Sequence, residues 1–270
     1  MLETGNNSKL RLTIRIGRNT LSFSTLDPTE TENPITYEPY VVKSGISMAA
    51  NLREAFKGAE LLTIPPARVT VLIDTPVLMV PVEQFEESTM EEFYRHAYPQ
   101  SEGELLLYNV LPDLNAVSVF SINKDLHMVI NDHFQQVRFI CALAPVWRYL
   151  HQRSFTGVRY KLYGYFHEGR LDIFSYQQNR FKFCNSFNSK RAQDSLYFLL
   201  YVWKQLMLNQ EQDEMHLVGD IPDREWLLEE LWKYVQKAYV INPTAEFNRA
   251  AATQFKDMPF DLMTYYVKGR

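Results

Sequence analysis

The sequence predicts an α/β protein built from two related halves, each a mixed sheet flanked by helices. A hairpin pattern occurs twice, over residues 10–27 and 160–177, about 150 residues apart. Each copy alternates apolar and polar side chains, turns at a Gly-Arg pair and resumes at a leucine. After each copy, helical and strand periods of hydrophobicity alternate along the chain. A repeat of this length indicates a duplicated domain.

Three short strands open the first half, because residues 10–16, 20–26 and 35–42 alternate in polarity and are rich in β-branched and aromatic side chains. Ser47 can cap a helix that Gly58 ends. The elements expected next are a buried strand over 69–73, a helix over 88–97 opened by a capping box, strands over 105–111 and 116–122, a helix capped by Asn123, a strand over 137–143 and a helix over 145–153.

The second half repeats this order, beginning with strands over 161–166, 171–175 and 181–185. A helix over 189–209 is the clearest in the chain, because its apolar side chains recur along one face. The elements expected after it are a strand over 216–218, a helix capped by Asp223, a strand over 239–241, a helix over 246–254 and a C-terminal tail that packs through its apolar side chains.

Three meandering strands followed by alternating helices and strands imply a mixed sheet with helices on both faces. Two such units in tandem are characteristic of the two-lobed actin-like ATPase fold, a duplicated ribonuclease H-like fold. We therefore expect lobe I over residues 1–155, with a strand pair inserted near 100–122, and lobe II over residues 156–270.

The composition suits a cytoplasmic protein without a nucleic-acid surface. Hydrophobic residues make up 46% of the chain and the net charge is −4, whereas a nucleic-acid surface normally brings a basic excess. The N-terminal residues lack the apolar core of a signal peptide, and no apolar stretch reaches the roughly 18 residues of a membrane span. Cys141 and Cys184 lie in apolar stretches and are expected to be buried free thiols.

Several segments carry a family resemblance that covers essentially the whole chain. They are YEPYVV, NLREAF, VLIDTPVLMVPVEQF, Tyr108-Asn109-Val110-Leu111 and the C-terminal MPFDLMTYY. The chain resembles an uncharacterised family, a domain of unknown function found in Bacteroidetes, to which an actin-like ATPase fold is assigned without an established activity. More distantly it is similar to the pilus assembly protein PilM and to the cytoplasmic domain of the type II secretion platform protein. Both of these proteins serve assembly platforms. The leading hypothesis is a non-catalytic scaffold or assembly partner of an unidentified protein, and it rests on the duplicated hairpin and on the missing acids described next.

Actin-like ATPases place a phosphate-binding turn that resembles Asp-x-Gly-Ser/Thr in the first hairpin of each lobe. The acid helps to hold hydrated Mg²⁺, and the glycine lets backbone N–H groups approach phosphate oxygens. The matching residues here are Arg15-Ile16-Gly17-Arg18 and His167-Glu168-Gly169-Arg170. Both glycines are kept, but Arg15 and His167 stand where the acids are expected.

Two later motifs are degraded as well. Gly219-Asp220 resembles the adenosine motif, which normally ends in two glycines, and a negative side chain at the second position would crowd a nucleotide. Asn242-Pro243 followed by Ala250-Ala251-Ala252 resembles the last connecting motif without its glycine. These departures predict a pseudo-ATPase with no catalytic residue, no bound cofactor and no metal site. The candidates for a degenerate nucleotide cleft are Arg15, Gly17, Arg18, Asp74, His167, Gly169, Arg170, Gly219 and Asp220.

Other interpretations stay open. An ATP-dependent enzyme or nucleotide switch could use displaced acids such as Asp74, which closes a buried strand, or Asp220. A regulatory module could bind a small anion at Arg15, Arg18 and Arg170, since guanidinium suits phosphate. For these three arginines, however, a role as solvated turn residues is favoured. The six histidines and two cysteines show no metal-ligand spacing.

Overall fold

The computed structural model describes residues 10–154, 159–177, 180–248 and 250–268. The chain divides into two compact units: the first comprises residues up to Val110, Val117–Ala144 and Ala251–Met258, and the second comprises Leu111–Ala116, Pro145–Ala250 and the residues from Pro259 onward. The lobe limits expected from the repeat stay a prediction. Every helix among the described residues is too short or too polar to span a lipid bilayer.

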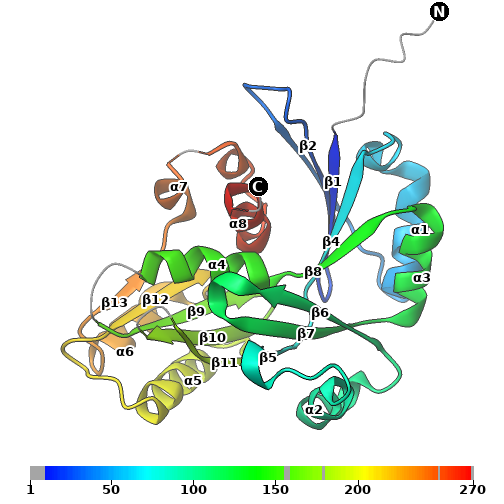
Figure 1. Cartoon of the computed structure of the whole chain (residues 1–270). Coiled ribbons are helices and arrows are strands. Elements are labelled where there is room, and N and C mark those ends of the chain that lie inside the picture. Colours follow the sequence, from blue (N-terminus) through cyan, green and yellow to red (C-terminus); the bar gives the residue numbers. More distant parts are fainter. Residues whose placement is uncertain (1–9, 155–158, 178–179, 249, 269–270) are drawn as a thin grey trace, which may run out of the picture. The chain divides into compact units, whose positions relative to one another are not determined.

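The main sheet of the first unit has the strand order β3-β2-β1-β4-β8 (Figure 1). The first three strands form an antiparallel meander, and β4 and β8 add in parallel beside β1. The strands are β1 (Arg11–Ile16), β2 (Leu21–Leu26), β3 (Ile35–Tyr40), β4 (Arg68–Ile73) and β8 (Val137–Cys141).

The two faces of this sheet differ in polarity because side chains alternate along each strand. One face is apolar and includes Leu12, Ile14 and Phe23, all fully or almost fully buried. Helices α1 (Met48–Gly58) and α3 (Lys124–His133) contact each other beside this sheet. The opposite face carries Arg15 and Ser22, which lie side by side in the β1–β2 register. This polar face is where the first hairpin presents its candidate site.

A second, three-stranded sheet in the first unit has the order β5-β7-β6. Its elements are β5 (Val77–Pro81), β6 (Leu105–Leu111), β7 (Ala116–Ile122) and the helix α2 (Met90–Ala97). Tyr94 of α2 packs against Val117 and Val119 in a small core. The strands expected over 105–111 and 116–122 are confirmed. Strand β5 was not expected, because its short apolar run ends at a proline and alternates poorly.

In the second unit the sheet has the order β11-β10-β9-β12-β13, with the same pattern of antiparallel and parallel pairs. Its strands are β9 (Lys161–His167), β10 (Arg170–Gln177), β11 (Arg180–Asn188), β12 (Glu214–Gly219) and β13 (Ala238–Val240). Helices α5 (Ala192–Gln205) and α6 (Arg224–Trp232) pack on its apolar face, where Leu199 and Leu231 are fully buried.

Hydrogen bonds tie the aromatic and polar face of this second sheet to two helices, α4 (Leu143–Ser154) and α8 (Phe260–Lys268). The Tyr176 hydroxyl donates to the Trp147 carbonyl of α4 at 2.7 Å. The remaining short elements are η1 (Glu60–Leu62), η2 (Val82–Gln84), η3 (Pro99–Ser101), η4 (Pro112–Leu114), α7 (Pro243–Glu246) and η5 (Ala251–Gln254).

Local predictions about helix ends were partly right. Ser47 and Asn123 cap α1 and α3 through their side chains, as expected. The capping box predicted before α2 does not form, because Thr89 is the N-cap and its side chain makes no capping hydrogen bond. Asp223 also precedes α6 without such a bond, since its backbone is left-handed. Cys184 is only partly buried, unlike Cys141.

Two helices end differently from the prediction. The helix expected over 189–209 stops at Gln205, and Met207 takes a positive φ of 53° and is 91% exposed. The helix expected over 246–254 does not form as one element. Instead α7 ends at Glu246 and η5 begins at Ala251, because Asn248 takes a positive φ of 48°, which a continuous helix excludes.

Candidate functional site

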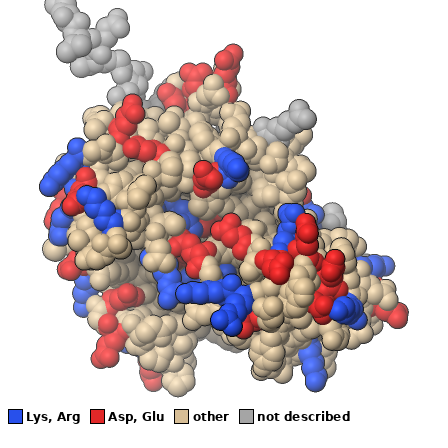
Figure 2. All heavy atoms as spheres, turned by 180° about the vertical axis from the view of Figure 1, so that it is seen from behind, with Lys and Arg blue, Asp and Glu red and all other residues tan. Residues whose placement is uncertain are grey.

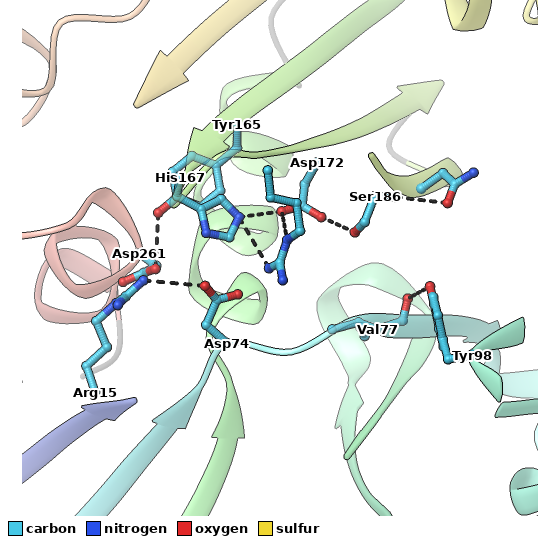
Figure 3. A network of polar contacts seen from close by, with 11 residues as sticks. Arg15, Asp74, Val77, Tyr98, Tyr165, His167, Asp172, Ser186 and Asp261 are labelled. Atoms are coloured by element: carbon cyan, nitrogen blue, oxygen red, sulfur yellow. Dashed lines mark hydrogen bonds and ion pairs between the residues drawn. The ribbon is translucent and has the colours of Figure 1, made fainter. Parts of the chain in front are cut away.

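The first hairpin places Arg15 in a buried ion pair. Its Nη2 lies 3.7 Å from Oδ2 of Asp74, and the two side chains are 2% and 1% exposed (Figure 3). Its Nη1 also donates a hydrogen bond to the Thr20 hydroxyl at 2.8 Å. The expectation that Arg15 is a solvated turn residue is therefore wrong. The cation that replaces the expected acid is neutralised inside the first unit.

The strand register explains why these two residues meet. Parallel pairing of β1 and β4 sets Ile16 opposite Ile73, so that the next residue, Asp74, follows at the same sheet edge. The Asp74 N–H then donates to the Ile16 carbonyl at 2.9 Å. Gly17 turns the chain immediately afterwards, donating its N–H to the Thr20 carbonyl at 2.8 Å. Arg18, by contrast, is exposed.

The second hairpin turns through two residues with positive φ, Glu168 at 47° and Gly169 at 74°. This backbone is that of a type I′ turn, which matches the twist of the paired strands and favours glycine. A Cβ at Gly169 would also lie 3.2 Å from Lys190 Cγ. The turn brings His167 opposite Arg170. Both side chains thus lie on the same face of the sheet.

Asp172 is the acid that these two residues surround. It is fully buried on β10; its Oδ2 is hydrogen-bonded to His167 Nε2 and accepts from Arg170 Nε at 3.2 Å. The Ser186 hydroxyl donates to its Oδ1. Burial alone would raise the pKa of Asp172, but the Arg170 charge and the His167 and Ser186 hydrogen bonds hold it below its usual value. Asp172 is therefore a charged carboxylate, supported by the Arg170 cation and by hydrogen bonds with His167 and Ser186.

Sequence reasoning missed Asp172 because it searched for an acid two residues before the turn glycine. The available sign was a lone acid in the apolar run Leu171-Asp172-Ile173, where a buried carboxylate needs cationic or hydrogen-bonding partners. The network extends further through aromatic stacking. The Tyr165 ring lies 4.3 Å from that of His167, and its hydroxyl donates to Asp261 of α8 at 3.1 Å.

The residues that resemble the adenosine motif, Gly219 and Asp220, lie at the end of β12, beside Phe166. Gly219 has φ of 97°, and a Cβ there would sit only 2.0 Å from the Phe166 carbonyl oxygen. The next residue, Asp220, donates its N–H to that same carbonyl at 2.9 Å and is exposed. The glycine is thus fixed by close packing between β9 and β12. The neighbouring Asp220 side chain takes no part in the Asp172 network.

Within each unit, then, the structure gathers part of the predicted set. Arg15, Gly17 and Asp74 meet in the first unit. In the second, His167, Gly169 and Arg170 meet around Asp172, with Gly219 on the adjacent strand. Over the described part of the chain, no group of three or more His, Cys, Asp or Glu side chains is arranged to hold a metal ion.

Two sheets with the same order, each a three-stranded meander extended by two parallel strands, define an actin-like ATPase fold. The chain is 31% identical to a protein from Bacteroides thetaiotaomicron described as having an actin-like ATPase fold and unknown function. That match covers 90% of this chain and 95% of the other, with a TM-score of 0.81. The fold class predicted from the repeated hairpin is confirmed.

The family follows from a second comparison. The model of a family described as Protein of unknown function (DUF3822) matches residues 1–238, and the chain belongs to this family. The resemblance inferred from the sequence is therefore confirmed. The chain is also similar to a protein in a PilM-PilN type IV pilus biogenesis complex, with 12% identity, a TM-score of 0.58 and coverage of 95% and 96% of the two chains. No curated protein sequence matches the chain.

Proposed function

We propose that this protein is a non-catalytic, actin-like scaffold or assembly partner, a pseudo-ATPase that keeps the fold without the hydrolytic chemistry. The observation that carries the proposal is the ion pair between Arg15 and Asp74. An arginine stands where a magnesium-binding acid is expected, and Asp74, which directly follows the adjacent strand β4, pairs with it.

The electrostatics of both hairpins support this proposal. Mg²⁺ is held by carboxylates that can share it with water and phosphate oxygens. Asp74 is ion-paired with Arg15, and Asp172 is surrounded by His167, Arg170 and Ser186. A metal ion would have to displace buried Arg15 at Asp74, or the partly exposed Arg170 and the hydrogen-bonded His167 at Asp172. Such a displacement leaves a buried charge without its partner, which is costly.

The same contacts give less support to the two alternatives. A nucleotide switch with displaced acids would need Asp74 to leave Arg15, while Asp220 is an exposed carboxylate. An anion-binding module would need arginines whose charge is not already matched. Arg15 and Arg170 both face buried carboxylates.

The partner in this proposal is another protein. The PilM-PilN complex is an instance of the same fold in an assembly, although the low identity makes this an analogy of fold. Acidic and basic side chains intermingle over the face seen in Figure 2, which fits a protein partner better than nucleic acid. The proposal keeps a cytoplasmic location, a compartment in which cysteines such as Cys141 and Cys184 stay reduced.

Phosphate release from ATP with Mg²⁺ tests the proposal. Wild type and Asp74→Asn are expected to give the same rate as a blank without protein, because Asp74 serves Arg15 and not a metal ion. Asp132→Asn, an exposed acid on α3, is the matched control. A wild-type rate well above the blank that Asp74→Asn abolishes and Asp132→Asn preserves would show a catalytic metal site.

A further inference from the structure

The solvent side of α5 is symmetric in its chemistry about Leu199, which lies near the middle of the helix. The exposed side chains of α5 are Gln193, Asp194, Tyr197, Tyr201, Lys204 and Gln205, and we call these six residues the α5 face. Each has a counterpart at the same distance beyond Leu199: glutamine with glutamine, tyrosine with tyrosine, and aspartate with lysine. In Figure 1, α5 lies on the side of the second unit's sheet opposite α4.

Two tyrosines form the centre of the α5 face. Tyr197 and Tyr201 are 62% and 47% exposed, and their rings lie 6.0 Å apart and almost parallel. Tyr197 also contacts the ring of Phe198 at 5.4 Å, and Phe198 stacks on Phe187 of β11 at 4.5 Å. The four rings are therefore continuous, and packing holds Tyr197 in place. A group of ordered aromatic rings that is open to solvent is typical of a contact surface.

An acid and a base flank the two tyrosines at opposite ends of the helix. Asp194 lies in the first turn of α5 and Lys204 in the last. Both positions suit the helix dipole, so the charges alone do not indicate a partner. They are ten residues apart, about 15 Å along the axis, and cannot pair within one helix. Neither forms an ion pair with another side chain in the described part of the chain.

A second copy of the chain satisfies both the rings and the charges. A twofold interface is self-complementary, so residue i contacts residue j and residue j contacts residue i. When two copies of α5 lie antiparallel about Leu199, Tyr197 faces Tyr201 of the other copy, and Asp194 faces Lys204. An acidic or a basic partner would match only one end of the α5 face.

The charges around α5 limit the size of this contact. Lys190 and Arg191 precede the helix, and in the antiparallel arrangement they lie beyond the end of the facing helix, near the uncharged and exposed Met207. Glu225 and Glu229 are exposed on the neighbouring helix α6 and would approach their own copies if the contact spread sideways. Their repulsion confines the contact to α5. Such an interface is small, and small interfaces give weak, transient association.

We propose that the chain self-associates through the α5 face as a weak twofold dimer, with Tyr197 packed on Tyr201 and Asp194 paired with Lys204 of the second copy. The tyrosine rings supply the buried area, and the two Asp–Lys pairs fix the antiparallel register. This inference goes beyond the scaffold proposal and does not depend on whether the chain hydrolyses ATP.

Sedimentation equilibrium of the full chain, at concentrations up to about 0.5 mM, tests the inference. The wild type is expected to show a monomer–dimer equilibrium in the micromolar range. Tyr197→Ser/Tyr201→Ser should weaken dimerisation at least about tenfold, because it removes the aromatic contact. Asp194→Lys and Lys204→Asp should each weaken it to a similar extent, because each sets like charges opposite each other twice in the dimer.

An equimolar mixture of Asp194→Lys and Lys204→Asp gives the sharpest readout. In the mixed dimer each contact again joins a lysine to an aspartate, so association should return to about the wild-type level. An interface elsewhere on the chain would not respond in this way. Recovery in the mixture also requires that both variants are folded.

The matched control is Asp125→Lys, which reverses an exposed acid in the first turn of α3 and should leave dimerisation unchanged. A wild type that stays monomeric at the highest concentration would overturn the inference. So would a dimer that the two charge variants leave intact, or a mixture of these variants that stays monomeric.

Discussion

The guanidinium of Arg15 in β1 lies 3.7 Å from the carboxylate of Asp74, which directly follows the parallel strand β4, and both side chains are almost fully buried. Arg15 stands at the position where the resemblance to actin-like ATPases predicts a magnesium-binding acid. A buried ion pair need not add net stability, but removing one partner leaves an uncompensated buried charge. This asymmetry makes the pair testable by single substitutions.

Replacing Arg15 with Ala should destabilise the protein by about 3–5 kcal/mol, because Asp74 would be left buried without its cation. Urea denaturation measures the free energy of unfolding. Arg11→Ala, an exposed arginine on the same strand, is the control and should change it by less than about 0.5 kcal/mol. Equal effects of the two substitutions would mean that Arg15 is effectively solvated.

Asp172 should contribute stability that disappears in acid. Burial opposes its charged form, but the Arg170 charge and the hydrogen bonds with His167 and Ser186 together hold the pKa of Asp172 in the folded protein below the ordinary value. The contribution is therefore complete above the unfolded pKa of about 4 and is lost as the pH falls through the lower folded pKa. Asp172→Asn should cost about 3 kcal/mol near neutral pH and progressively less in acid.

Urea denaturation of wild type and Asp172→Asn at several pH values measures this difference. Asp132→Asn, at an exposed position, should differ little from wild type in its free energy of unfolding at every pH. If the difference in the free energy of unfolding between wild type and Asp172→Asn stays constant from neutral pH into acid, Asp172 is not charged in the folded protein.

Gly219→Ala should destabilise the protein by at least about 3 kcal/mol, because the new Cβ would combine a backbone clash with left-handed strain. The Cβ would lie 2.0 Å from the Phe166 carbonyl oxygen. Gly103 has a similar φ of 83° but open space around it, so Gly103→Ala should cost only about 1 kcal/mol. Thermal unfolding compares the two, and equal costs would argue against tight packing of β9 and β12.

Asn109 of β6 is expected to protect the open edge of β8. Its Nδ2 donates to the Phe139 carbonyl at 3.0 Å, and its Oδ1 accepts from the Cys141 N–H at 2.9 Å. Asn109→Leu should cost about 2 kcal/mol and speed hydrogen exchange at the Cys141 amide. Asn109→Asp keeps an oxygen that can accept from the Cys141 N–H, so this amide should exchange more slowly than in Asn109→Leu. Unchanged exchange in the leucine variant would refute this role.

The repeated hairpin was sufficient to predict the fold, because alternation, turn residues and helical periods agree along both halves. Strand and helix types were right wherever a long periodic pattern existed, as in β1 and α5. The errors lie where single residues decide the backbone. Met207 and Asn248 take positive φ. At position 207, neither the residue type nor the local pattern of hydrophobicity marks the end of a helix.

The candidate site was predictable only as a set of positions. Motif comparison located Arg15 and His167 but could not give their partners, since Asp74 and Asp172 reach them through sheet register. Arg15 reads as a turn residue in the sequence because it stands two residues before Gly17. Its burial depends on parallel pairing with a strand more than fifty residues later, which no local pattern contains.

Calorimetric titration of the wild-type protein with ATP and Mg²⁺ tests the central claim most directly. Because Arg15 pairs with Asp74 and His167 bonds to Asp172, no binding is expected at nucleotide concentrations up to about 1 mM. A dissociation constant of about 1 mM corresponds to a binding free energy of about −4 kcal/mol. Saturable binding at micromolar concentrations that requires Mg²⁺ and is lost in Asp74→Asn would contradict the account. It would show that Asp74 leaves Arg15 to hold a metal ion.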